Sequence, residues 1–189
     1  MRIGIAALLG AIVVFFWQFL AHMVLPIGEM GFRQPATSDI VLQAVATGLP
    51  QPGIYFLQTI DPNKMNDEAT VKAWAEKSQK NPYVWAVVNT PPTGDPTSMA
   101  PQLAKQFVLN FLAALLATFV LAATAWTFGA RVIGAVAFGL FGWLMNIVPQ
   151  WNWYRFPSDF MVGNLLEQGI GWLLGGIAIA WWLGRAVRR

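Results

Sequence analysis

Eight polar side chains stand inside or beside four long apolar stretches of this 189-residue chain. They are Gln18, His22, Asn110, Asn146, Arg155, Asn164, Glu167 and Gln168. Amides within an apolar helix usually link helices by hydrogen bonds, whereas an acid there is costly and marks a functional-site hypothesis by default. The chemistry available to this set is therefore cross-helix bonding, ligand binding or proton handling.

Glu167 has two interpretations. In the first, it is protonated or paired with His22 or Arg155 and serves only to hold helices together. In the second, it carries a proton, a cation or a ligand. We expect Glu167 to be the central residue of the polar set, hydrogen-bonded across helices under either interpretation.

The residue types present argue against known catalytic and metal sites. The chain has one His and no Cys, and His22 with Glu167 supplies only two of the three protein ligands usual for catalytic zinc. It contains no Walker loop, nucleophile elbow or Rossmann glycine pattern. The sequence thus predicts no catalytic residue, no metal and no required cofactor, and it favours a protein that is not an enzyme. An enzyme using Glu167 and His22 ranks third among the hypotheses.

The elements that position the polar residues are predicted to be membrane helices. Hydrophobic residues make up 56% of the chain and charged residues 11%, against about 25% charged residues in soluble domains. The stretches long enough to span a bilayer are residues 3–25, 106–128, 132–149 and 160–183. The predicted fold is an all-α membrane protein with four transmembrane helices and a small α+β extracytoplasmic domain inserted between helices 1 and 2.

Arginines in the short loops predict the orientation of the chain. Five of them fall on one side if the four spans alternate, namely Arg2, Arg131, Arg185, Arg188 and Arg189, and only Arg155 falls on the other. The positive-inside rule then places both termini in the cytoplasm of a bacterial inner membrane, with residues 26–105 in the periplasm. Residues 1–25 are expected to be an uncleaved signal anchor, and no binding to nucleic acid is expected.

Residues 26–105 change abruptly to a polar composition. The patterns predict a helix after the cap at residues 37–39, a strand at 53–60, a helix capped by Asn66 that runs to about residue 79, and a second strand at 83–88. Two strands and two short helices bury little apolar surface, so this segment is expected to lean on its own membrane helices or on a partner.

Depth and helix face predict that the polar residues meet. At 1.5 Å per residue, all of them except Arg155, which is in the outer loop, fall about 5–12 Å below the outer ends assigned to the spans. Small residues, as in Gly171-x-x-x-Gly175 and Ala135-x-x-x-Gly139, continue the same faces toward the inner ends. We expect a tightly packed inner half and an outward-opening polar pocket.

The loop PQWNWYRFP at residues 149–157 precedes a last span that contains Glu167 and Gly171-Trp172-Leu173. Together with the anchor FFWQFLAHMVLP at residues 15–26, it resembles an uncharacterised family of bacterial four-span inner-membrane proteins. The resemblance implies four spans with an outer domain after the first, and it implies no activity.

Two functional hypotheses lead. The first is a non-catalytic accessory or assembly subunit of a larger inner-membrane complex, with membrane lipid and other membrane subunits as partners. The alternative is a binder or carrier of a small amphipathic molecule, a lipid or quinone, in the polar pocket of the bundle.

Overall fold

The computed structural model describes residues 1–57, 60–80, 86–89, 95 and 97–185. The chain divides into two compact units by its contacts. The helical unit comprises Met1–Phe32 and Asp95–Arg189, and the inserted unit comprises Arg33–Gly94. Residues 26–32 and 95–105, placed with the outer segment by their composition, thus belong to the helical unit by their contacts.

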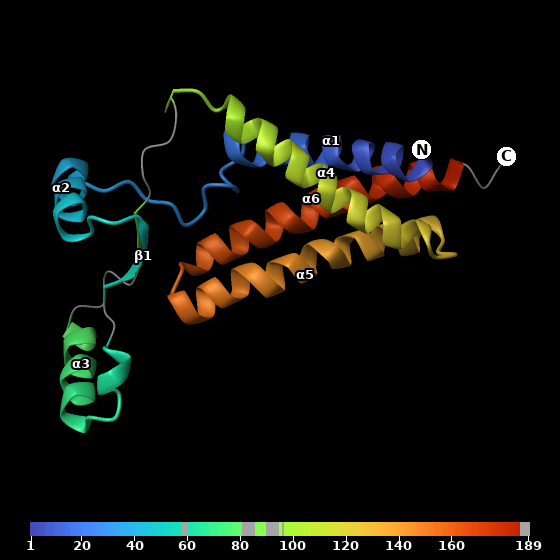
Figure 1. Cartoon of the computed structure of the whole chain (residues 1–189). Helices are drawn as coiled ribbons and strands as arrows, with labels where there is room; N and C mark the ends of the chain where they lie inside the picture. Colours follow the sequence, from blue (N-terminus) through green and yellow to red (C-terminus); the bar gives the residue numbers. More distant parts are fainter. Residues whose placement is uncertain (58–59, 81–85, 90–94, 96, 186–189) are drawn as a thin grey trace. The chain divides into compact units, whose positions relative to one another are not determined.

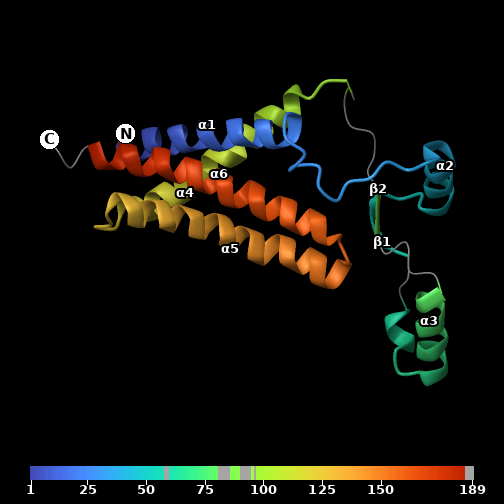
Figure 2. The ribbon, with the colours of Figure 1, turned by 180° about the vertical axis from the view of Figure 1, so that it is seen from behind.

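Four long helices build the helical unit: α1 (Arg2–Met23), α4 (Ala100–Ala122), α5 (Phe128–Tyr154) and α6 (Ser158–Arg185). They run up and down in alternation, so the C-terminus of α1, the N-terminus of α4 and the α5–α6 turn share one end, the distal end (Figure 1). The chain's N-terminus and the end of α6 share the other, the terminal end. Helix α6 packs most extensively against α5 and α1, and α1 also packs along α4 (Figure 2).

Three of these helices, α1, α4 and α5, are long and apolar enough to cross a membrane, which indicates a membrane protein. The prediction of four spans is therefore supported for three helices. Helix α6 is long, but it is rich in Gly and Trp, which contribute little to hydropathy, and it contains Asn164, Glu167 and Gln168.

Helix α5 differs from its predicted boundary. We expected a span ending at Pro149 and an outer loop at residues 150–159, but Pro149 lies inside the helix, which continues to Tyr154. The turn ends the helix through Arg155, whose φ is 57°, and the backbone N–H groups of Arg155 and Phe156 both donate to the carbonyl of Gln150. Trp151 Nε1 donates to Ser158 Oγ at 3.0 Å, and this bond ties the last turn of α5 to α6. An interior Pro removes one helix hydrogen bond and its ring crowds the carbonyl four residues earlier, so contacts with the rest of the bundle must offset that cost where a helix continues past it.

The packing of the helical unit is inverted relative to a soluble protein. Its buried core contains mostly small residues, and it gathers Ala6, Ala7, Ala11, Ala114, Leu121, Ala135, Ile179 and Leu183. Large apolar side chains lie on the outside, such as Phe16 at 61%, Leu116 at 71% and Ile133 at 72% exposure. Exposed apolar area of this extent marks a surface that meets lipid or protein.

Glycines set the closest helix contacts in the terminal half. A Cβ at Gly175 would lie 2.7 Å from Val14 Cγ2 and 3.4 Å from the Gly10 carbonyl oxygen, so α1 and α6 nearly touch by their backbones. A Cβ at Gly176 would likewise meet Ala135 of α5. The predicted tight half is confirmed at Gly171, Gly175 and Ala135, all of which are buried.

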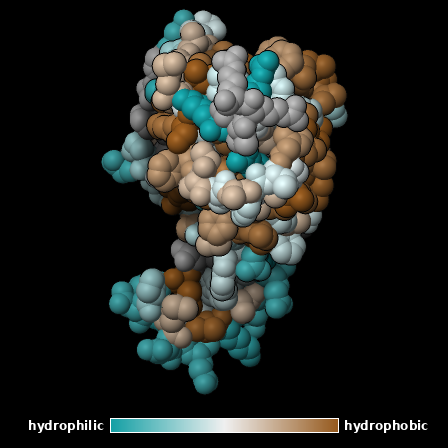
Figure 3. All heavy atoms as spheres, turned by 90° about the vertical axis from the view of Figure 1, so that its right-hand side faces the viewer, coloured by the Kyte–Doolittle hydropathy of each residue, from teal (hydrophilic) through white to brown (hydrophobic). Residues whose placement is uncertain are grey.

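Arginines and tryptophans gather at the terminal end. Arg2 donates to the carbonyl of Leu183, Arg131 Nη2 donates to the carbonyl of Thr124 at 3.4 Å, and Arg185 lies 4.4 Å from the Trp181 ring centroid. Figure 3 views the molecule from this side and shows hydrophobic side chains along the flanks of the helical unit. Polar groups at a helix end below an apolar flank are typical of a membrane interface.

The inserted unit contains α2 (Ser38–Gly48), β1 (Gly53–Phe56), η1 (Pro62–Lys64), α3 (Glu68–Lys80) and β2 (Ala86–Asn89). The predicted helix, strand, helix, strand order is confirmed, with β1 antiparallel to β2 and Ile54 opposite Val88. The first strand ends at Phe56 rather than at residue 60, and residues 58–59 of its predicted range and 83–85 of the second strand's lie outside the described residues. The cap of α3 is Asp67 rather than Asn66, because the Asp67 carboxylate accepts from Ala69 N at 3.2 Å and from the Thr70 hydroxyl. None of the described residues of this unit is buried.

Candidate functional site: a polar chamber and a lateral groove

A chain of amides crosses from α4 to α1 in the distal half. Gln106 Nε2 donates to Asn110 Oδ1 at 2.9 Å, and Asn110 Nδ2 donates to Gln18 Oε1 at 2.6 Å. Asn110 is only 8% exposed, so this bond satisfies a buried amide. The structure therefore joins Gln18 and Asn110 as the polar layer predicted.

Glu167 lies against α1 in the same half. Its Oε2 is 3.3 Å from Nε2 of His22, and the Glu167 side chain is 12% exposed while that of His22 is 47% exposed. Trp17 Nε1 donates to the backbone carbonyl of Glu167 at 3.0 Å. This bond joins α1 to α6 beside the His22–Glu167 pair. The predicted cross-helix contact of Glu167 is thus present, and its partner is His22.

The turn after α1 folds back over this pair. Gly28 donates its N–H to the carbonyl of Ala21 at 2.9 Å, and it packs so closely on the His22 imidazole that a Cβ there would collide with the ring. Gly31 has φ +89° and packs on Phe160, where any side chain would be both strained and obstructed. The imidazole is consequently clamped between Gly28 and Glu167.

These elements enclose a polar chamber of about 580 Å³ at the distal end. Its lining comes from α1, the 24–32 turn, α4 and α6: Phe15, Gln18, Phe19, His22, Met23, Gly28, Glu29, Phe32, Met99, Leu103, Gln106, Phe160, Asn164, Glu167 and Gln168. This volume is in the range that holds a drug-sized ligand, and the mixture of apolar walls with a few polar groups is typical of ligand sites.

A lateral groove of about 490 Å³ lies between α4 and α5, because α4 meets α5 at the terminal end and diverges from it toward the distal end (Figure 1). Its floor comes from α1 and α6. The lining is largely apolar: Val14, Gln18, Gln106, Leu109, Asn110, Ala113, Leu116, Ala117, Phe138, Gly142, Trp143, Asn146, Ile147, Gln168 and Trp172.

Three amides, Gln18, Gln106 and Gln168, line both cavities. The chamber and the lateral groove therefore adjoin at these side chains. Gln18 and Gln106 are tied to Asn110, but the Gln168 side chain forms no hydrogen bond with any described residue. The Gln168 amide is half-buried, and at the junction of the two cavities it is accessible for a hydrogen bond to a ligand.

Two predicted asparagines bond within their own helices rather than across helices, and the Gln168 side chain bonds no described residue. Asn164 Nδ2 donates to the carbonyl of Phe160 at 2.9 Å in its own helix, and Asn146 Nδ2 donates to that of Gly142 at 3.0 Å. Asn164 lines the chamber and Asn146 the lateral groove. Arg155 lies at the α5–α6 turn and lines neither cavity. The side-chain amide of a helical Asn can donate either to the backbone carbonyl four residues earlier or to a neighbouring helix. The sequence alone does not show which of the two bonds forms.

Sequence reasoning missed Gln106, Trp17, Gly28 and Glu29. The length rule places Gln106 at the first residue of a span, although Gln106 lies at i−4 from Asn110, a spacing that puts two helical side chains together. Gly28 and Glu29 belong to a turn whose return over α1 depends on tertiary contacts. The signal that was available for this turn is Pro26 followed by Gly28 and Gly31.

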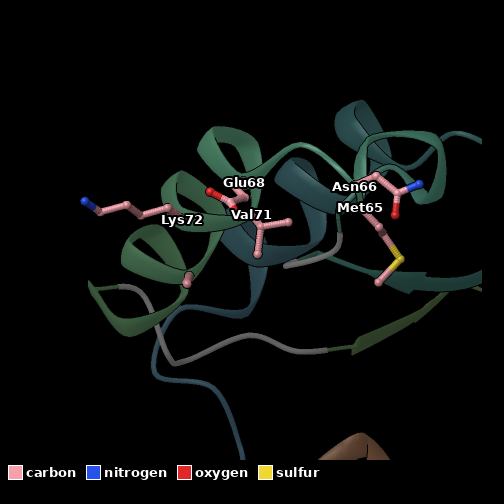
Figure 4. A pocket seen from close by; sticks show the side chains of 6 residues that line it. Met65, Asn66, Glu68, Val71 and Lys72 are labelled. Atoms are coloured by element: carbon pink, nitrogen blue, oxygen red, sulfur yellow. The ribbon is translucent and has the colours of Figure 1, made fainter.

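A further hollow, of about 430 Å³, lies on the inserted unit beside α3 (Figure 4). Met65, Val71 and Ala75 line it together with Asn66, Glu68 and Lys72, and the Lys72 side chain extends away from it. Its polar groups do not converge on one point, so the chamber and the lateral groove are the stronger candidate site.

No family model matches the chain, and neither a curated protein nor a solved structure is significantly similar to it.

Proposed function

We propose that the helical unit binds one amphipathic molecule, with its polar head in the chamber and its apolar tail in the lateral groove. The proposal rests on the junction between the chamber and the lateral groove. There, Gln18, Gln106 and Gln168 line both cavities, and the Gln168 side chain bonds no described residue. A molecule that is polar at one end and apolar at the other matches this sequence of surfaces. A membrane lipid and a quinone are the two classes with that shape.

The walls of the lateral groove support the placement of the tail. Leu109, Leu116, Phe138 and Ile147 come from the two diverging helices and offer hydrocarbon to a chain that enters sideways from a bilayer. The chamber offers hydrogen-bonding groups instead, namely His22, Glu167 and the amides. The proposed site lies between continuous helices, so binding needs no helix to be interrupted at the site.

The membrane arrangement is part of this proposal. We place α6 across the bilayer as a fourth span, because it packs between α1 and α5, two helices suited to cross a membrane. The arginine distribution puts the terminal end in the cytoplasm and the chamber at the periplasmic side of a bacterial inner membrane. A C-terminal alkaline phosphatase fusion should be inactive and a cytoplasmic reporter active. The reverse would contradict the orientation.

A substitution that fills the lateral groove with a larger side chain tests whether the helical unit binds such a molecule. A Cβ at Gly142 meets nothing within 4 Å, so Gly142→Leu should fold and occupy the space meant for a tail. Gly169→Leu is the matched control, because Gly169 is equally unobstructed and lines neither cavity. Native mass spectrometry after mild detergent extraction should show one bound lipid or quinone with wild type and Gly169→Leu, and none with Gly142→Leu. Equal retention by all three would refute the proposal.

The inserted unit favours a second function, that of an accessory subunit of a larger membrane complex. Its described residues include no buried core, and Ile40, Leu42 and Ile54 are each at least 64% exposed. A two-stranded sheet also leaves edges that accept a partner strand. Pull-down from native membranes, compared between wild type and an Ile40→Ser/Leu42→Ser variant, tests this role. Recovery of the same protein partners with both would count against it.

A further inference from the structure

The charges around the chamber restrict the kind of head group that it accepts. Glu29 and Glu167 line the chamber together with His22, and neither Lys nor Arg is among its described lining residues. Two carboxylates against one imidazole make an anionic surface in which a phosphate or carboxylate without a counter-charge would be repelled. The chamber is therefore suited to a positive group.

Aromatic rings strengthen this selection. Phe15, Phe19, Phe32 and Phe160 line the chamber from α1, the 24–32 turn and α6. The Phe32 and Phe160 rings contact edge to face, with centroids 5.8 Å apart. Faces of aromatic rings attract ammonium groups, and rings combined with carboxylates are a known way to recognise quaternary ammonium ligands.

We infer that the chamber binds an ammonium group carried by the amphipathic molecule, with Glu167 and Glu29 as counter-charges and the phenylalanine rings as walls. This inference rests on the proposed function, and it names the ligand class as an alkylammonium amphiphile. Glu167 is held by His22 at 3.3 Å and keeps its second carboxylate oxygen for the ligand, whereas Glu29 lies on the exposed rim.

Four probes with the same acyl or alkyl chain separate the head-group classes. Alkyltrimethylammonium carries only the positive group, lysophosphatidylcholine carries it beside a phosphate, lysophosphatidylglycerol carries only a phosphate, and monoacylglycerol is uncharged. Each probe competes with radiolabelled lysophosphatidylcholine for the full chain in maltoside micelles. We expect the two ammonium probes to bind about tenfold more tightly than the other two, a preference of the size that a cation–π and carboxylate site supplies.

Variants that each remove one negative charge test which carboxylates produce the preference for ammonium probes. Glu167→Gln keeps the shape of the side chain and should reduce the tenfold preference to about threefold or less, and Glu29→Gln should reduce it in the same sense. Glu76→Gln on the exposed face of α3 removes the same charge elsewhere and should leave the preference unchanged. Size-exclusion elution confirms that each variant folds.

The outcomes separate this inference from the proposed function. Equal binding of all four probes, abolished by Gly142→Leu, would overturn the ammonium site and keep the amphiphile site. Tighter binding of lysophosphatidylglycerol would also overturn the ammonium site. Binding of none of the probes would refute the proposed function and the inference together.

Discussion

The two halves of the helical unit use the same four helices for opposite purposes. In the terminal half, glycine and alanine let α1, α5 and α6 approach until their backbones nearly touch, as at Gly10 and Gly175. In the distal half, α4 diverges from α5, and amides, an imidazole and a carboxylate line the space between the helices. The firmly packed half therefore permits the other half to stay open, because it supplies the contacts that hold the bundle together.

Substitution of Gly175 tests the packed half and has the largest expected effect on stability. Gly175→Leu puts a side chain where Val14 and the Gly10 backbone already lie, so we expect a loss of about 1–3 kcal/mol or more from overpacking. Gly142→Leu enlarges the same residue type in the open half and should change stability by less than about 0.5 kcal/mol. Equilibrium unfolding in mixed detergent micelles measures both, and equal losses would erase the difference between the halves.

Replacement of Glu167 tests whether the open half depends on its polar pair. Glu167→Leu should cost about 1–2 kcal/mol in stability, because His22 loses its partner, and Glu167→Gln should unfold like wild type. The readout is thermal unfolding in detergent.

Gly28→Ala disturbs the His22–Glu167 pair through His22 instead of Glu167, because the new methyl group must displace the His22 ring. We expect a loss of stability similar to that of Glu167→Leu, and the combination of the two changes should cost little more than one alone. Additive losses would show that Gly28 does not act through His22.

Asn110 offers a smaller test of the amide chain. Asn110→Leu removes the 2.6 Å bond to Gln18 and the 2.9 Å bond from Gln106, and at about 0.6 kcal/mol per membrane hydrogen bond we expect a loss near 1 kcal/mol. Asn146→Leu is the control, because Asn146 bonds only its own helix and should change stability less. A greater loss at Asn146 would contradict the assignment.

The smallest expected effect lies outside the helical unit. The Thr70 hydroxyl, aided by the Ala69 and Thr70 backbone N–H groups, holds the pKa of Asp67 below its ordinary value of 3.8. Because the pKa of Asp67 is lower in the folded than in the unfolded state, the ionised carboxylate stabilises α3 above pH 3.8. This stabilisation is lost as the pH falls through the lower pKa of the folded state. Amide chemical shifts of Ala69 and Thr70 should follow this titration and lose it in Asp67→Ala. A midpoint above 3.8 would show that the carboxylate is not stabilised in the fold.

Sequence reasoning succeeded where periodicity and length decide the structure. The long helices, the small-residue contacts and the cross-helix contact of Glu167 follow from residue type and helical spacing. It failed at Pro149, because a local rule predicted a helix end that the Trp151–Ser158 bond and the α5–α6 packing overrode. It could not place Gly28, Glu29 or the divergence of α4 from α5, since these depend on how whole helices meet.

Photocrosslinking with a lipid that carries a diazirine on its acyl chain tests whether a tail occupies the lateral groove. In reconstituted vesicles, a bound tail in the lateral groove should label Leu109, Phe138 and Ile147 well above Phe16 and Ile133, which lie outside the groove and are 61% and 72% exposed. Gly142→Leu should remove the excess at the groove and leave labelling of Phe16 and Ile133 unchanged. Labelling that only follows exposure, with no excess between α4 and α5, would show that no tail occupies the lateral groove.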